Sequence, residues 1–251
     1  GEVWAPNSVL NYYGLGNETP NTEASARYYQ VQFAQAALST LMSYEMDDGL
    51  SVSFGPSLEY TDIAASAHRF VGQPQAGVSP ATFEDHLYVG LGGAFNLQSL
   101  DSRLNPRQGF RWQSTARLYD AVPGGTGTYG QFGSTAALYF SPRLSPQVTV
   151  ALRVGGATNI GEFPFYRANT LGGQANLRGF RHTRYAGRSS FFQNVELRAA
   201  LSSFSSYLGW GTLGALGFLD NGRVWADGQS SDLWHQGYGG GLWISLYDRL
   251  V

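Results

Sequence analysis

The stretch "FFQNVELRAAL", residues 191–201, alternates apolar and polar side chains almost without interruption. The apolar set, with Gln193 as its exception, falls on one face: Phe191, Val195, Leu197, Ala199 and Leu201. The opposite face carries Phe192, Asn194, Glu196 and Arg198. Because successive side chains of a β-strand point to opposite faces of a sheet, this period of two predicts a strand with one apolar and one charged face.

The same alternation covers most of the chain, for example in "QVTVALRVG" (residues 147–155) and "GFRWQSTARLY" (residues 109–119). The expected strands lie near residues 8–14, 27–45, 50–62, 84–98, 109–121, 129–141, 147–156, 188–202, 211–221 and 237–247. Several have the length of roughly 9–11 residues that a tilted strand needs to cross a bilayer. The sequence therefore predicts an all-β protein.

Short and long connections alternate between these strands. "MDDG" (46–49) and "SPRLSP" (141–146) are short, whereas residues 14–26, 63–83, 157–187 and 222–236 are long and rich in Gly, Pro, Asn and Ser. Short turns at one end and long loops at the other are typical of an outer-membrane barrel. We therefore predict an antiparallel transmembrane β-barrel of roughly ten to twelve strands. It forms a single domain over residues 1–251.

Periodicity alone leaves open a soluble β-sandwich or a lipocalin-like barrel, in which the apolar face points inward. Two features favour the membrane barrel. Charges lie in mid-strand on the polar faces, as in a water-filled lumen: Glu196, Arg198, Arg153, Arg111 and Arg117. Aromatic residues stand at strand ends, as in an interfacial girdle. These are Tyr28, Tyr29, Tyr139, Phe140, Trp225 and Tyr247.

Composition narrows the possible functions. Charged residues make up 14% of the chain and the net charge is −2, so the arginine-rich stretch "LGGQANLRGFRHTRYAGRSSFF" (171–192) is a local feature and we expect no nucleic-acid partner. The chain has no cysteine, which excludes disulfides and thiolate zinc sites. Its histidines lack metal-ligand spacing, and no nucleophile elbow occurs. "GTGTYG" (125–130) opens no predicted helix, so it does not predict a dinucleotide site. We expect no enzyme activity, no metal and no cofactor.

Three motifs follow one another in the C-terminal half: "LRGF" (177–180), "ELR" (196–198) and "GFLDNG" (217–222). Their order resembles the barrel of the bacterial surface antigen superfamily, which includes the BamA-type insertases and the two-partner-secretion transporters. The resemblance implies a long loop folded into the barrel, whose arginine pairs with acids on the inner wall of the next two strands. An arginine and a carboxylate form planar, two-pronged pairs, so this charge need not contact nucleic acid.

The resemblance assigns a lumen latch to five residues: Arg178, Gly179, Phe180, Glu196 and Asp220. Arg178 would be the loop arginine, Gly179 its tight turn and Phe180 its aromatic neighbour, with Glu196 and Asp220 as the wall acids. We expect Arg198 and Arg153 to act as supporting lumen charges. Three further stretches resemble the same family: "YYGLGNETP" (12–20), "DSRLNPRQG" (101–109) and "GYGGGLWIS" (237–245).

Two features depart from the family pattern. POTRA modules, which normally precede its barrels, are not found here, so the resemblance is to a short form. The chain stops at "LYDRLV" (246–251), where Asp248 is expected to form a turn and "RLV" to begin another strand. The sequence is therefore either a trimmed region of a longer protein, with C-terminal strands missing, or a small barrel.

The resemblance implies a place in the Gram-negative outer membrane, in contact with its lipids. The expected function is to assist insertion and assembly of unfolded outer-membrane proteins, or to translocate polypeptides or lipids. One alternative is a membrane anchor for a fused or associated periplasmic domain of the phosphoesterase kind, because "YYGLGNETP" resembles barrels fused to such enzymes. The other alternative is a passive pore. The sequence is also compatible with a homodimer.

Overall fold

The computed structural model describes residues 2–21, 25–47, 49–64, 67–84, 86–122, 127–143, 147–206, 209–246 and 249–250. The strands are β1 (Glu2–Asn11), β2 (Gln30–Ser39), β3 (Met42–Asp47), β4 (Leu50–Ile63), β5 (His86–Leu100), β6 (Gly109–Ala121), β7 (Tyr129–Phe140), β8 (Val148–Gly161), β9 (Asn169–Leu171), β10 (Tyr185–Gly187), β11 (Ser189–Ser206), β12 (Gly209–Trp225), β13 (His235–Leu246) and β14 (Arg249–Leu250). Short 3-10 helices are η1 (Ala26–Tyr29), η2 (Phe70–Gly72), η3 (Pro74–Ala76), η4 (Pro80–Phe83) and η5 (Phe165–Arg167).

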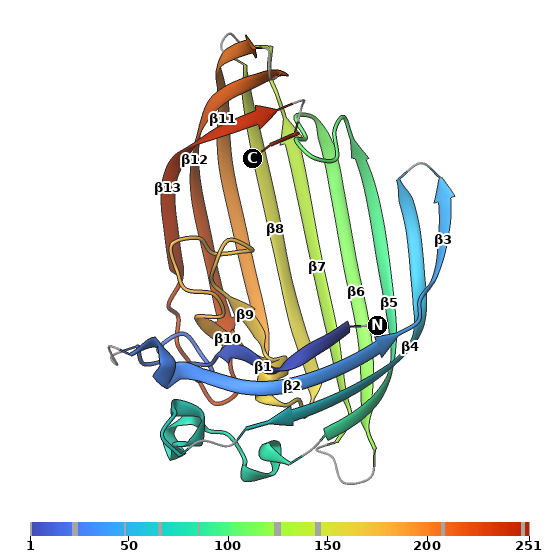
Figure 1. Ribbon diagram of the computed structural model, residues 1–251, viewed down its shortest axis with the longest axis vertical. Coiled ribbons are helices and arrows are strands. Elements are labelled where there is room, and N and C mark those ends of the chain that lie inside the picture. The colour runs from blue at the N-terminus through green and yellow to red at the C-terminus, as the bar shows by residue number, and fades with distance from the viewer. Residues whose placement is uncertain are drawn as a thin grey trace.

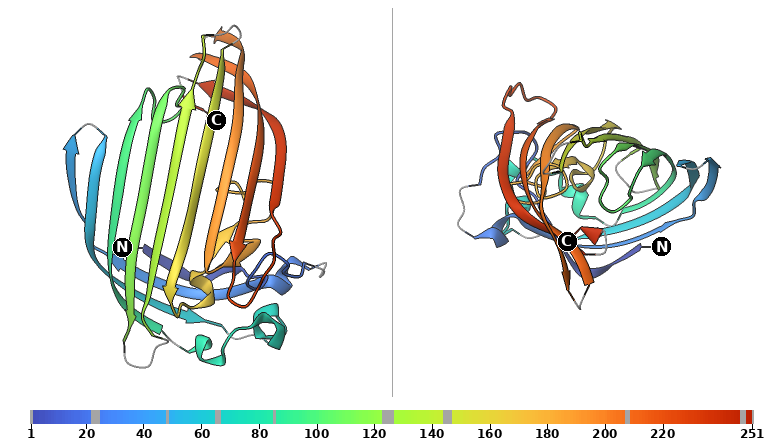
Figure 2. Two further views of the ribbon diagram at one scale, coloured as in Figure 1. Left: turned by 180° about the vertical axis from the view of Figure 1, so that it is seen from behind. Right: turned by 90° about the horizontal axis from the view of Figure 1, so that it is seen from above.

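One antiparallel sheet of 12 strands dominates the molecule, in the order β1-β2-β4-β5-β6-β7-β8-β11-β12-β13-β14, with β3 paired to β4. The sheet curls into an incomplete ring, with β1 and β2 running across its front (Figures 1 and 2). Within the described ranges, no pairing joins β1 to β13 or β14. Strands β9 and β10 form a separate two-stranded ribbon. The predicted antiparallel β-barrel fold is confirmed.

The apolar faces of the strands point away from the curl. On β11, Val195 and Leu197 are 44% and 51% exposed, whereas Asn194 on the opposite face is 5% exposed. Their neighbours on β8 and β12, Leu152 and Leu219, are also exposed. An apolar exterior around a polar interior is the arrangement of a membrane barrel and the reverse of a lipocalin.

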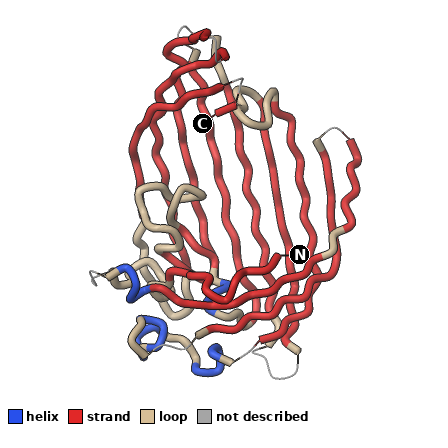
Figure 3. Tube along the Cα trace, viewed as in Figure 1, coloured by secondary structure: helices blue, strands red, loops and turns tan. Residues whose placement is uncertain are grey.

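The two ends of the barrel differ as predicted. The connections that follow β3, β5, β7, β11 and β13 are short and lie at one end, which we call the short-turn end. Those that follow β1, β4, β8 and β12 are longer and lie at the other, the long-loop end, where the short helices gather (Figure 3). The connection after β6 (122–128) is an exception, because it belongs to the long-loop end and is as short as the turns of the opposite end. None of the helices in the described part of the chain is long and apolar enough to cross a membrane.

Several details differ from the sequence prediction. The single strand expected over residues 27–45 is two strands, β2 and β3, which pair with β4 in the same register. The hydrogen-bond ladder that β2 and β3 form along β4 breaks at Pro56 of that strand, because proline has no N–H to donate. Strands β8 and β12 also run to Gly161 and Trp225, beyond the expected ends. His235 was expected in a loop, and instead it begins β13.

The predicted aromatic girdle is only partly present. Phe140 and Trp225 are exposed on the outside, at 58% and 43%. Tyr29 is wrong for a girdle, because it is 1% exposed and packs with Tyr13 and Phe70 in an internal cluster at the long-loop end. Tyr28 packs against the same cluster. Tyr247 and the turns expected at Asp48 and Asp248 lie outside the described residues.

Candidate functional site

The loop between β8 and β11 carries the "LRGF" motif and folds against the concave side of the sheet (Figure 1). Its tip is a compact turn, in which Gly173 bridges to Leu177 and its N–H donates to the carbonyl of Phe180 over 3.0 Å. Gly179 has a φ of 89°, a left-handed conformation that glycine adopts without steric cost. The glycine therefore lets the chain reverse directly after Arg178.

Arg178 binds Asp220 through both its side chain and its backbone. Its Nε and Nη2 donate to the two carboxylate oxygens over 2.8 and 2.7 Å, and its backbone N–H donates to Oδ2 over 2.9 Å. Asp220 is 0% exposed. A buried carboxylate is stable only when its lone pairs are satisfied, and the two-pronged arginine supplies most of what this one needs.

Glu196, on the neighbouring strand β11, lies between two arginines. Arg178 donates to it through Nη1, and Nε of Arg198 donates to its other carboxylate oxygen over 2.7 Å. The structure thus brings Arg178, Glu196 and Asp220 together, and we call these three residues the arginine latch. Its functional role stays a prediction.

Arg153, on β8, supports the same loop by another route. Its Nε donates to Oδ1 of Asn194 over 2.8 Å, and its Nη2 donates to the carbonyl of Ala175 over 2.5 Å. Asn194 in turn donates to the carbonyl of Asn176 over 2.8 Å. Arg153 therefore contacts the loop backbone, while Arg198 contacts the wall acid.

Sequence reasoning missed the residues of β12 and β13 that make room for the latch. The guanidinium carbon of Arg178 lies 3.7 Å from the ring centroid of Phe218, a cation–π contact. A Cβ at Gly237 would lie 2.0 Å from the carbonyl oxygen of Arg178, and one at Gly239 would lie 2.9 Å from the Phe218 ring. The glycines of "GYGGG" (237–241) are the signal that could have found them, because glycine in a strand often marks close approach of another backbone.

Phe180 belongs to an aromatic group beside the latch. Its ring lies 5.5 Å from that of Tyr185 and 5.9 Å from that of His235, and these two rings stack on each other at 3.5 Å. Leu177 and Val224, both 0% exposed, belong to the same cluster. The loop is therefore fixed by an apolar contact as well as by charge.

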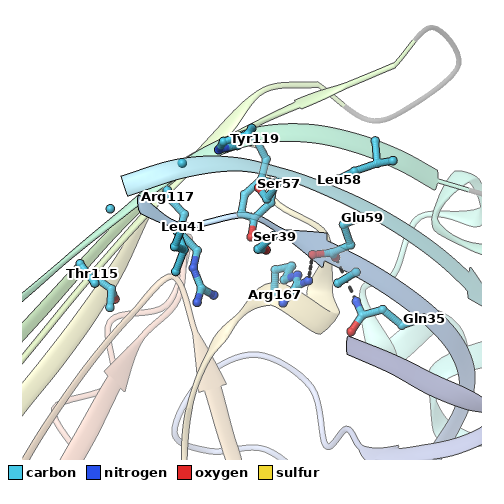
Figure 4. Close-up of a pocket in the computed structure, with 16 residues that line it drawn as sticks. Gln35, Ser39, Leu41, Ser57, Leu58, Glu59, Thr115, Arg117, Tyr119 and Arg167 are labelled. Atoms are coloured by element: carbon cyan, nitrogen blue, oxygen red, sulfur yellow. Dashed lines mark hydrogen bonds and ion pairs between the residues drawn. The ribbon is translucent and has the colours of Figure 1, made fainter. Parts of the chain in front are cut away.

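A second ion pair fastens the start of the loop to the opposite wall. Arg167, in η5, pairs with Glu59 of β4, which is 3% exposed and also accepts a hydrogen bond from Gln35 over 3.0 Å (Figure 4). Burial lowers the pKa of Arg167, but the hydrogen bond and charge of Glu59 outweigh it and hold that pKa above its usual value. The pair borders a cavity of about 400 Å³ inside the barrel, which Arg117 also lines.

Every charged group of the arginine latch is paired, so none is free to act as an acid, base or nucleophile. Within the described ranges, no three His, Asp or Glu side chains gather in a way that could hold a metal ion. The ion pairs hold one long loop to two parts of the barrel wall, at β11–β12 and at β4.

Comparison with known proteins supports the same conclusion about the fold. The Omp85 superfamily domain matches residues 10–245, almost the whole chain. The chain belongs to the Omp85 superfamily. Among solved structures it is similar to BamA from Haemophilus ducreyi lacking POTRA domains 1–3, with a TM-score of 0.66 and 16% identity. The match covers 85% of this chain and 48% of that one, so the chain spans about half its length. No curated protein matches.

Membership of the Omp85 superfamily places the protein in the bacterial outer membrane, within a family of insertases and transporters. The exposed apolar side chains on the outside of this Omp85 barrel therefore contact lipid. In such barrels the short turns face the periplasm and the longer loops face the exterior. The latch thus lies in the lumen, on a loop that enters from the outer side.

Proposed function

We propose that this Omp85 barrel assists the insertion and assembly of other outer-membrane proteins, or the passage of polypeptides or lipids. The observation that carries the proposal is the arginine latch. It holds the loop inside the lumen, so the wall of the barrel is the surface left for a substrate. Family membership supports the same general role.

We place the working surface at the seam between the two margins of the sheet. β14 is joined to β13 through the pairs Ser245–Leu250 and Leu246–Arg249. At the other margin, the pairing of β1 with β2 is irregular between Trp4 and Ser8. An unpaired strand edge offers N–H and C=O groups on which another strand can form. A substrate strand would add there, and a locally thinned bilayer would ease its entry.

The proposed work is non-covalent, so the protein would need no catalytic residue and no cofactor. Its partners would be unfolded outer-membrane proteins and the lipids beside the seam. The proposal differs from a passive pore, because a loop bound at both Arg178 and Arg167 obstructs free diffusion. It also differs from an anchor, whose barrel would need no working seam.

The test is an insertion assay. The protein is refolded into liposomes, an unfolded test barrel is added, and its folding is followed by gel mobility. Empty liposomes and liposomes that hold an unrelated barrel are the references. We expect faster folding than with either reference, and loss of the gain in Arg178→Ala. Folding no faster than with the unrelated barrel would overturn the proposal and favour the anchor for a periplasmic domain.

A further inference from the structure

The segment that follows β1 reaches across to the far margin of the sheet. Residues 15–19, "LGNET", lie between the β9–β10 ribbon and the end of β12, although their own strand pairs with β2. We call these five residues the clasp.

Asn17 pairs with the end of β12 at a position that the pairing with β13 does not reach. The register between β12 and β13 ends at Gly222 and His235, so Val224 has no partner on β13. The side-chain amide of Asn17 fills that position: its Nδ2 donates to the carbonyl of Val224 over 2.8 Å, and its Oδ1 accepts from the N–H of Val224 over 3.0 Å. Asn17 is 5% exposed and Val224 is 0% exposed. Both buried backbone groups are thereby satisfied.

The residues on either side of Asn17 bind the ribbon and the β12–β13 loop. The N–H of Gly16 donates to the carbonyl of Ala186 over 2.7 Å, in an antiparallel bridge to β10. Gln229 donates to the carbonyl of Leu15 over 2.8 Å. Gly16 has a φ of 109°, and a Cβ there would lie 1.6 Å from the Gln229 side chain. Only glycine fits this position.

Arg184 fastens the end of the clasp to the lumen loop. Its Nη1 and Nη2 donate to the hydroxyl and the carbonyl of Thr19 over 2.5 and 2.7 Å. Its guanidinium lies over the rings of Tyr13 and Tyr185, at 4.8 and 4.6 Å from their centroids. Arg184 is 9% exposed. The clasp is thus bound to the same loop that carries the latch.

All of these contacts lie at the long-loop end of the barrel, and they join the first-strand side of the seam to β12 and its loop. We propose that the clasp closes the seam at the long-loop end, so that the seam opens from the short-turn end. The part about opening rests on the proposed insertion function, whereas the closure itself does not. Asn17 is the positioning residue, because it alone satisfies both backbone groups of Val224.

The closure can be measured by cross-linking, since the chain has no cysteine of its own. Glu18 of the clasp faces Ser231 of the β12–β13 loop, and their side-chain oxygens are 2.9 Å apart. The double variant Glu18→Cys, Ser231→Cys is treated in liposomes with a short bis-maleimide. We expect rapid cross-linking, and a rate roughly tenfold lower when Asn17→Ala is added, because two buried backbone groups lose their partners.

The matched control is Asn21→Ala. Asn21 lies in the same connection and is exposed. Among the described residues it makes no hydrogen bond or ion pair with the far margin, so its variant should cross-link like the parent. Gel mobility before and after heating shows that each variant is folded. If Asn17→Ala does not fold, Gln229→Ala removes one exposed contact of the clasp and should slow the cross-link in the same direction. Equal rates in the parent and the folded clasp variant would overturn the closure.

The direction of opening is tested on the cross-linked protein. It should accelerate folding of the test barrel as well as the uncross-linked double variant does. Loss of acceleration on cross-linking would show that the long-loop end must open, and would overturn that part of the proposal. If neither form accelerates folding, the insertion function fails, while the cross-linking rates of Asn17→Ala and Asn21→Ala still decide whether the clasp exists.

Discussion

At the scale of single residues, Arg178 joins the loop to two strands at once, because its guanidinium spans Asp220 on β12 and Glu196 on β11. Removing it would leave one carboxylate fully buried and a second largely buried, without their main partner. Arg178 is important for stability because a buried carboxylate without a partner is strongly destabilising. The strength of the ion pair itself matters less.

Arg178→Ala should lower the free energy of unfolding by about 3 kcal/mol, near the low end for a broken buried pair because the Arg178 side chain is 23% exposed. Arg178→Lys should recover part of this, since it keeps the charge and loses the two-pronged geometry. Heat-modifiability on gels and proteolysis of the loop measure the effect. Arg181→Ala, an exposed arginine on the same loop, is the control. Unchanged protease resistance in Arg178→Ala would contradict the role.

Gly237→Ala should displace the loop without touching a charge, because its Cβ would lie 2.0 Å from the Arg178 carbonyl oxygen. Overpacking of this kind typically costs about 1–3 kcal/mol, and it should appear as faster proteolysis of the loop. Gly241→Ala is a matched control on the same strand and face, since its Cβ would meet nothing within 4 Å. Equal protease resistance in the two variants would argue against the close approach.

The latch residues could be predicted from the sequence and the rest of their surroundings could not. Glu196 falls on the polar face by parity, and the order of the three motifs relates it to Arg178 and Asp220. The alternation of apolar and polar side chains does not predict that Phe218 lies under the guanidinium of Arg178. It also does not predict that Gly237 faces the loop. Those contacts depend on the register of β11, β12 and β13, which is set by long-range pairing.

At the scale of elements, the connections at the long-loop end are tied together by one arginine. Arg188, just before β11, donates to the carbonyl of Gly161 over 2.9 Å and to both carboxylate oxygens of Asp227 over 2.8 Å. It therefore links the end of β8 to the β12–β13 loop. The hydrogen bond from Arg188 holds the pKa of Asp227 below its usual value.

This pair predicts an acid-sensitive loop. Because the pKa of Asp227 is lower in the folded state than in the unfolded one, its stabilising effect is present above the unfolded pKa, near 4. It is lost as the pH falls from there through the folded pKa. The protection of residues 226–234 from hydrogen exchange, measured against the intrinsic exchange rate at each pH, should therefore fall below about pH 4. Asp227→Asn should exchange faster at neutral pH and show less change with acid; an equally steep acid response would refute the assignment.

The strands themselves were largely predictable, and their limits were not. Alternation located the long strands of the wall from β4 to β13, since each has one face in lipid and one in the lumen. The first strand was misplaced: it was expected at residues 8–14, and β1 runs over Glu2–Asn11. Alternation could not show that Pro56 divides β2 from β3, or that Tyr29 turns into an internal cluster instead of the interface. Both outcomes depend on what lies opposite the residue in the folded sheet, which the local pattern does not contain.

At the scale of the whole molecule, the outer surface of the barrel is matched to lipid. Leu219, on β12, is 51% exposed and pairs with Val195 and Tyr238 on the adjacent strands, which are exposed as well. These side chains gain little from one another and are stabilised by the surrounding hydrocarbon. Substitutions here act through the membrane and leave the lumen intact.

Leu219→Lys should therefore destabilise the folded protein in bilayers by up to about 2–4 kcal/mol, the range for a lysine in the apolar band. The same change at Leu104, which is 62% exposed in the turn between β5 and β6, should have little effect because that turn faces water. Urea unfolding in lipid vesicles measures both. A similar loss of stability in the two variants would contradict the placement of the band.

The arginine latch and the clasp differ in how far apart their partners lie along the chain. Arg178 and Asp220 are 42 residues apart, whereas Asn17 and Val224 are 207 apart. Bringing distant segments together loses more chain entropy and slows folding. By this argument the C-terminal half of the wall can form around its arginine before the first strand arrives, and we expect the clasp contacts, with that of Asn17 among them, to form late in the assembly of this barrel.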